Sequence, residues 1–183
     1  MPALDLKARV LGSHLFFFRE GDAYTVPGAG TCGAESKPDA NDPDYINLGP
    51  IEDWEDDVSG GSDLEIWRPS PGNLVLKDII EIKAKMMVKA TTGEMSALAI
   101  ESFYRSATNI ASLTGQFNPL SGTLKKGWLH GQRYDHENNL VFTFDLWGRL
   151  KVSGGMKSGG ELVRPQFEFA VLYSSLNTAQ IGE

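Results

Sequence analysis

The sequence has a single cysteine, no long hydrophobic run and no region rich in positive charge. Cys32 has no second cysteine to pair with, so an internal disulfide is excluded and nothing in the sequence requires an oxidising compartment. No stretch approaches the roughly eighteen apolar residues of a membrane span, and the N-terminus lacks the apolar core of a signal peptide. We therefore expect a soluble protein that is made in the cytoplasm.

The shortage of positive charge is concentrated in one segment. The formal net charge is −7, which argues against a dedicated nucleic-acid binder. Residues 35–65 hold eleven acidic residues and one basic residue, whereas residues 66–183 hold thirteen basic and ten acidic ones. A chain of 183 residues, 41% of them hydrophobic, can bury a sizeable core. We predict a single domain over residues 1–183, with a loop-rich acidic insertion at about 35–72.

The apolar periodicity predicts a mainly β protein. Apolar residues alternate with Glu and Lys in "IEIKAKMMVKA" (80–90), which is typical of a long strand with one buried and one charged face. Further strands are indicated at 14–19, 123–135, 139–152 and in 162–175, where Phe167, Phe169, Val171 and Tyr173 share a face; "HENN" (136–139) forms a hairpin turn.

One helix is predicted over residues 91–107. Thr91 and Glu94 have the spacing of a capping box, and the apolar residues that follow recur at helical intervals for about three and a half turns. The order of strands, one helix and strands again favours an antiparallel β-sandwich or barrel with one flanking α-helix and a long protruding loop or hairpin.

Residues that carry catalytic or metal chemistry are present but poorly arranged. Cys32 has no local nucleophile signature. A metal site at His130 and His136, with Asp135 and Glu137, would have to span a strand end and its turn. The carboxylates of the acidic run lie in one short segment, whereas catalytic pairs usually face each other across a cleft, and their spacing does not match a calcium loop. We expect no catalytic residue, no metal and no cofactor.

The acidic run itself, "IEDWEDDVSGGSDLEIW" (51–67), is not a disordered tail. Large apolar residues are interleaved with its acids: Ile51, Trp54, Val58, Leu64, Ile66 and Trp67. This pattern predicts a long hairpin, bent at Gly60 and Gly61, whose apolar side is covered by a neighbouring subunit. We expect deletion of residues 52–65 to leave a folded domain that no longer stacks.

Taken together, these features resemble the major tail tube proteins of long-tailed (siphovirus-like) bacteriophages. The likeness extends over nearly the whole chain and is carried by texture and order, without a short diagnostic motif. It lies in "VLGSHLFFF", "YINLGPIEDWEDDVSGG", "IEIKAKMMVKATT", the helix "MSALAIESFYRSA", and the strands "LVFTFDLWGRLKV" and "PQFEFAVLYSS". Tube proteins of contractile injection machines share this architecture and are not separated from it by the sequence.

The resemblance implies a structural role. Such proteins form hexameric rings whose inner strands close into a continuous barrel, and the rings stack into a tube that carries DNA from capsid to host. The partners implied are other copies of the chain, the tape measure protein, and baseplate or terminator proteins. DNA would pass through the lumen without specific binding, because a negative wall repels phosphate whereas lysines would bind it through counterion release. The implied location is the virion tail.

The charge pattern suggests which residues make the assembly contacts. Lys83, Lys85 and Lys89 share the polar face of one strand, so we expect this face to lie away from the lumen or to pair with carboxylates. Complementary fields between the acidic segment and basic residues of an adjacent copy would fix register. The predicted contact residues are Asp53, Trp54, Glu55, Asp56, Asp57, Trp67, Lys83, Lys85, Lys125 and Lys126.

Two other functions stay open from the sequence. A monomeric β-sandwich that binds carbohydrate or a host surface would use exposed tryptophans as stacking platforms, with Trp54, Trp67, Trp128 and Trp147 as candidates. A hydrolase would depend on carboxylates such as Asp53 or Glu55. Exposed, aligned aromatics and a monomeric state would favour the first, and loss of turnover on substitution of either acid would favour the second.

Overall fold

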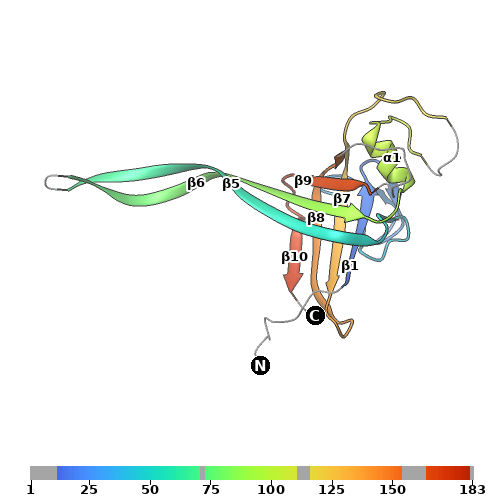
Figure 1. The fold of residues 1–183 in the computed structure, drawn as a ribbon, viewed down its shortest axis with the longest axis horizontal. Coiled ribbons are helices and arrows are strands. Elements are labelled where there is room, and N and C mark those ends of the chain that lie inside the picture. The colour runs from blue at the N-terminus through green and yellow to red at the C-terminus, as the bar shows by residue number, and fades with distance from the viewer. Residues whose placement is uncertain (1–11, 71–72, 111–115, 154–163, 182–183) are drawn as a thin grey trace.

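The fold is a β-sandwich with one short helix at its flank and a long two-stranded projection (Figure 1). The computed structural model describes residues 12–70, 73–110, 116–153 and 164–181, and the side chains of 60–64, 67–70 and 73–84 lie outside the description. Its elements are β1 (Gly12–Arg19), β2 (Ala23–Tyr24), β3 (Gly30–Thr31), β4 (Ile46–Asn47), β5 (Ile51–Ser70), β6 (Asn73–Thr92), α1 (Ala97–Phe103), β7 (Lys125–Tyr134), β8 (Leu140–Ser153), β9 (Gln166–Val171) and β10 (Thr178–Ile181).

The main sheet is antiparallel and is organised around β8. Its strands follow the order β4-β1-β7-β8-β9-β6-β5, and β10 also pairs with β8. β7 pairs with one edge of β8 over Lys125–Tyr134. The other edge of β8 is divided, because β10 pairs with Phe142–Asp145 and β9 with Gly148–Ser153. The predicted antiparallel sandwich with a flanking helix is confirmed, and the described strands do not close into a barrel.

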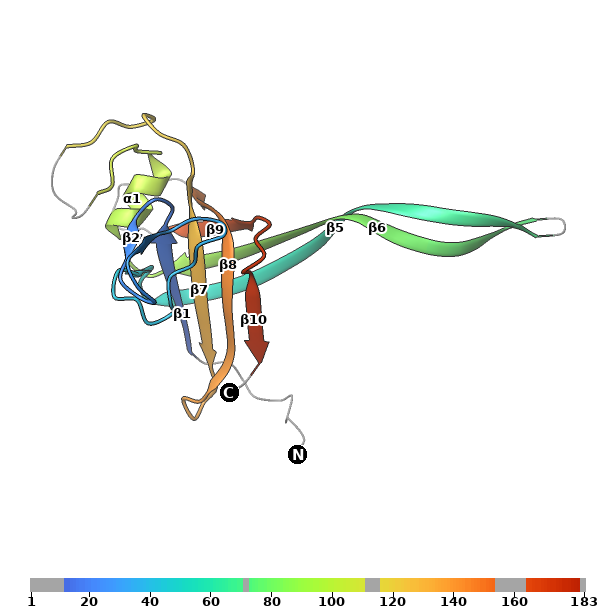
Figure 2. The same ribbon diagram turned by 180° about the vertical axis from the view of Figure 1, so that it is seen from behind.

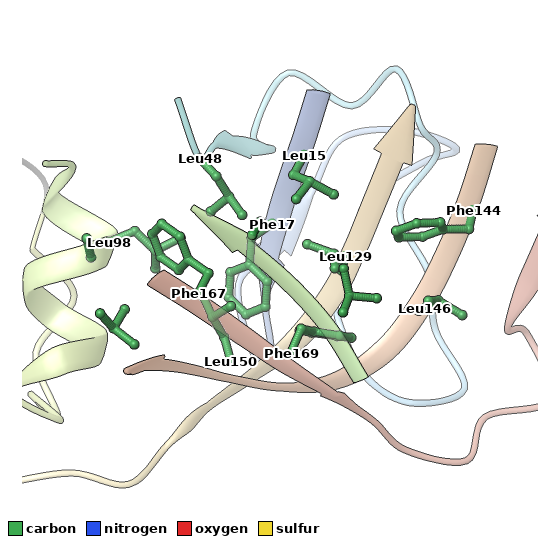
Figure 3. Close-up of a cluster of buried hydrophobic side chains, with 14 residues drawn as sticks. Leu15, Phe17, Leu48, Leu98, Leu129, Phe144, Leu146, Leu150, Phe167 and Phe169 are labelled. Atoms are coloured by element: carbon green, nitrogen blue, oxygen red, sulfur yellow. The ribbon is translucent and has the colours of Figure 1, made fainter. Parts of the chain in front are cut away.

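Alternation along the strands places apolar side chains on one face of this sheet. In β8, Phe144, Leu146 and Leu150 point into the main core with Phe167 and Phe169 of β9, as Figure 3 shows. The predicted alternation is also confirmed where the side chains of β6 are described, since Val88 and Ala90 are buried in this core while Lys85 is exposed. Leu98 and Ala99 of α1 close the end of the core.

A second, smaller cluster lies on the opposite face of β7 and β8. It consists of Phe18, Cys32, Trp128 and Trp147, with Tyr45 packed against it. The segment between β1 and β4 supplies Cys32 and Tyr45 and therefore covers this face.

The projection is formed by the outer parts of β5 and β6. These two strands pair with each other over 20 residues each, whereas β9 pairs with β6 only at Met87–Thr91. We call residues 59–70 and 73–85 the arm; their backbone pairs only within the arm among the described residues. Figure 2, from behind, shows the arm leaving the body as in Figure 1.

The predicted bend at Gly60 and Gly61 is wrong. Gly60 pairs with Ala84 and Ser62 with Lys83, so Gly61 is the extra residue of a β-bulge, and the strand continues to Ser70. A bulge increases the local twist without ending the pairing. The chain reverses between Ser70 and Asn73.

The helix is shorter than predicted and starts later. Thr91 and Thr92 still belong to β6, and the N-cap is Ser96, whose Oγ accepts a hydrogen bond from Ala99 N at 3.1 Å. Cross-strand pairing of β6 therefore prevails over the capping-box signal, and α1 has seven residues. The predicted C-terminal strand ends at Val171, so Tyr173 is outside it and 86% exposed, and β10 was not predicted.

Close approach of β1 to β7 depends on a glycine. A Cβ at Gly127 would lie 1.9 Å from the carbonyl oxygen of Phe18. We expect Gly127→Ala to lower the free energy of unfolding by roughly 1–3 kcal/mol or more, because the two strands would have to separate. Gly28→Ala is the matched control, since no atom lies within 4 Å of its Cβ position. Equal urea midpoints for the two variants would contradict this packing.

Candidate assembly surfaces

Residues 51–58 of the acidic run form the part of β5 that lies on the body, at the base of the arm. Because β5 is a strand, its residues alternate between the two faces of the sheet. Trp54 and Asp56 pair with Ala90 and Val88, which point into the core, whereas Asp53, Glu55 and Asp57 pair with Thr91, Lys89 and Met87. We call the row Asp53, Glu55 and Asp57 the acidic edge, because β5 ends the sheet.

One lysine partly neutralises the acidic edge. Lys89 Nζ lies 3.6 Å from a carboxylate oxygen of Glu55 and 3.4 Å from one of Asp57. Attraction by Glu55, together with the hydrogen bond to Asp57, raises the pKa of Lys89 above its ordinary value. The expectation that this lysine face pairs with carboxylates of the acidic segment is thus met at Lys89. Lys85 is exposed, and the side chains of Lys83 and Trp67 lie outside the described part of the chain.

Trp54 and Asp56 attach β5 to the body. The Trp54 ring packs edge-on against Phe144 with the ring centroids 5.3 Å apart. The guanidinium of Arg133 lies 4.1 Å from the Trp54 ring centroid and bonds Asp56 at 2.7 Å. Trp54 Nε1 also donates to Asp56 at 2.6 Å. The structure thus places these two predicted contact residues within the fold, and a deletion of 52–65 would remove part of the core.

Lys125 also serves the fold. Its Nζ lies 2.8 Å from Oε1 of Glu101, a side chain of α1 that is fully buried. Arg19 Nη2 lies 2.8 Å from the other oxygen of Glu101, and Ile110 N donates to the same oxygen at 2.8 Å. Two cations and a backbone amide therefore surround one buried carboxylate. Lys126, on the other face of β7, is partly exposed, and its Nζ lies 3.8 Å from Glu20.

The candidate nucleophile and metal ligands are placed apart. Cys32 is 3% exposed, and burial raises the pKa of its thiol to about 12, so the thiolate is disfavoured. His136 is exposed, and Asp135 accepts backbone hydrogen bonds from Glu137 and Asn139 within its turn. No cluster of three potential metal ligands occurs among the described residues.

Two of the candidate stacking tryptophans are inaccessible. Trp128 and Trp147 are 0% and 3% exposed and pack against each other in the smaller cluster. Trp54 is held between Phe144 and Arg133. These three side chains therefore do not form an exposed line that a sugar ring would need.

A partly buried histidine–carboxylate–lysine set was missed in the sequence. His130 Nδ1 lies 2.7 Å from Asp145 Oδ1, and Lys37 Nζ lies 2.7 Å from Asp145 Oδ2. Burial alone would raise the pKa of Asp145, but the hydrogen bonds from His130 and Lys37 lower it below its ordinary value. The register of the β7–β8 hairpin places His130 opposite Asp145, and this was the signal that would have found the pair.

The Glu101 site gives a test of the ion pairs in the body. Glu101→Gln keeps the side-chain shape but leaves Arg19 and Lys125, each with 14% side-chain exposure, without their carboxylate. We expect the free energy of unfolding to fall by about 3–5 kcal/mol, as when one partner of a buried ion pair is removed. Glu137→Gln, in the exposed turn, is the matched control. Urea unfolding measures both, and a loss below about 1 kcal/mol would show that Glu101 is not needed.

Comparison with known proteins assigns no family. No protein-family model matches the sequence, and no curated protein sequence matches it significantly. In the described ranges, no helix has the length and apolar character needed to cross a membrane.

Proposed function

We propose that this chain is a structural virion protein whose copies form hexameric rings that stack into a bacteriophage tail tube. The tube would serve as the conduit through which DNA reaches the host. The observation that carries this proposal is the arm, a long two-stranded ribbon that extends from a compact sandwich and pairs only with itself among the described residues (Figure 1).

Such an arm needs a surface to rest on. A single two-stranded hairpin is marginally stable in water, and three or more strands or a packed face are needed for independent stability. Val58, where β5 leaves the body, is 69% exposed although it is large and apolar. A second copy of the chain is the partner that a tube subunit always has beside it. An arm that contacts a different surface of the next copy makes a heterologous contact, which produces rings or filaments.

The body also offers strand edges to a neighbour. β10, with the sequence TAQI, pairs with β8 on one side and is exposed at all four positions. It contains neither proline nor a charged residue, which are the usual means of protecting an edge strand. β5 likewise ends the sheet, beyond β9 and β6 on the same edge of β8. Both edges can extend the sheet into the next copy of a ring.

The charge supports passage of DNA without binding. A net charge of −7 gives a tube wall that repels phosphate, so DNA slides instead of being held by counterion release. The role is structural and uses neither catalysis nor a cofactor. The partners would be further copies of the chain, the tape measure protein, and baseplate or terminator proteins. Synthesis in the host cytoplasm would precede incorporation into the virion tail.

Imaging of the purified protein tests this proposal. We expect negative-stain electron microscopy to show rings or tubes, and analytical ultracentrifugation to show species larger than the monomer whose proportion rises with concentration. A protein that stays monomeric at high concentration, and forms no rings or tubes when tail extract is added, would contradict the proposal.

Shortening the arm tests its part in stacking. Ser59 and Lys85 are paired across β5 and β6, so replacing residues 60–84 with Asn-Gly closes the hairpin at the body in a two-residue turn. We expect the variant to keep the thermal unfolding midpoint of the body, since Trp54 is retained, and to form no tubes. The control is a full-length arm with Lys85→Gln, which changes one exposed arm side chain. Tube formation by the shortened variant would exclude the arm from stacking.

A further inference from the structure

The outer face of the sheet, which points away from the main core, is charged differently at β5 and at β7 and β8. One row across it runs through Lys151, Glu168, Lys89 and Glu55, which are cross-strand neighbours in β8, β9, β6 and β5. Charges alternate along this row, with 3.3 Å between Lys151 and Glu168 and 3.6 Å between Lys89 and Glu55. Opposite charges on facing strands stabilise a sheet, so the middle of the face is satisfied within the chain.

The end formed by β5 has an excess of acid. The acidic edge contains three carboxylates, and Lys89 is the lysine that contacts two of them, Glu55 and Asp57. Asp53 and Glu55 are exposed. This end of the face therefore presents net negative charge on a strand that has no further strand beside it among the described residues.

The part of this face formed by β7 and β8 has an excess of base. Lys126 of β7 and Arg149 of β8 are direct cross-strand neighbours, and with Arg105 they line a hollow of about 440 Å³. Backbone and side chains of 122–124 complete its wall, and no acidic residue lines it. We call this site the basic hollow. Further along β7 and β8, the segment between β1 and β4 covers Trp128 and Trp147. This segment does not cover Arg149, which is exposed.

Two features of the basic hollow are unfavourable in an isolated chain. Lys126 and Arg149 lie directly opposite each other on neighbouring strands, where like charges repel. The carboxylate paired with Lys126 is that of Glu20, at a distance of 3.8 Å. Arg105 has φ of 50°, a left-handed conformation that a residue with a side chain seldom adopts and that is often found at functional sites. An anionic partner in the hollow would relieve the repulsion.

We propose that the basic hollow of one copy receives the acidic edge of β5 from a second copy. The exposed carboxylates of Asp53 and Glu55 supply the anionic partner, and both surfaces belong to the same face of every chain. Because β9 and β6 lie between the donor and the receptor, each copy can use both at once. The contact is heterologous, and it closes into a ring when the rotation between copies allows it.

This inference rests on the proposed self-assembly and identifies the contact within a ring, which is distinct from the stacking made by the arm. The partner is a second copy of the chain and not the phosphates of a nucleic acid. The net charge of −7 opposes nucleic acid, while the acidic edge is present at the concentration of the protein itself. Complementary charges of this kind set orientation and suppress wrong pairings.

Charge reversal on each surface tests the contact. One variant carries Lys126→Glu and Arg149→Glu, and the other carries Asp53→Lys and Glu55→Lys. We expect each alone to need at least about tenfold more protein than the wild type to assemble, because like charges then face each other. An equimolar mixture should assemble again. The first variant keeps its acidic edge, which can bind the unchanged basic hollow of the second variant. The reversed edge of the second variant is basic and can bind the reversed, acidic hollow of the first.

The readout is sedimentation velocity at low and high salt, with far-UV circular dichroism as the check of folding. The double variant Asp53→Asn, Glu55→Gln is milder, because it places no positive charge beside Lys89. We expect it to weaken assembly without unfolding the chain. Assembly of either reversed variant at wild-type concentrations, or failure of the folded mixture to assemble, would overturn the inference. A wild-type protein that does not assemble at all would instead overturn the proposed function.

Discussion

Everything else in this structure depends on the pairing of β8 with strands on both of its edges. Since β7 occupies one edge and β9 and β10 share the other, β8 connects the two halves of the sandwich. Its side chains therefore alternate between the two faces of the sheet. Phe144 and Leu150 enter the main core. Asp145, Trp147 and Arg149 point to the opposite face. The partly buried ion pair, the smaller cluster and the basic hollow all follow from this one strand.

The same alternation separates the acid of β5 that holds the strand on the body from those that lie at the sheet edge. Trp54 and Asp56 point toward the core side and are held by Phe144 and Arg133, so they keep β5 on the body. Asp53, Glu55 and Asp57 point the other way and remain available at the sheet edge. A single acidic run thus occupies two environments that residue type alone does not distinguish. The arm begins where this attachment ends, because β9 pairs with β6 only at Met87–Thr91 and the outer parts of β5 and β6 pair only with each other among the described residues.

Several parts of this arrangement were accessible from the sequence. The alternation of residues 80–90 and the turn at 136–139 specify two pairs of antiparallel strands, because side-chain period and turn position are local properties. Residues equidistant from that turn had to face each other, which places Lys126 with Arg149 and His130 with Asp145. The helix start was not predictable from its capping signal, since pairing of Thr91 and Thr92 with neighbouring strands prevailed over it. β10 lacked an alternating pattern because all its residues are exposed.

The sequence by itself determined the fold class, the position of the long strands and the concentration of acid in one segment, because these depend on periodicity and composition. The tertiary structure decided which charges are used internally. Lys125 forms an ion pair with buried Glu101, and Lys89 forms ion pairs with Glu55 and Asp57. In contrast, the basic hollow is lined by Lys126, Arg149 and Arg105 and by no acidic residue. Such differences arise from contacts between residues far apart in the chain, and no local pattern records which partners the folded sheet will bring together.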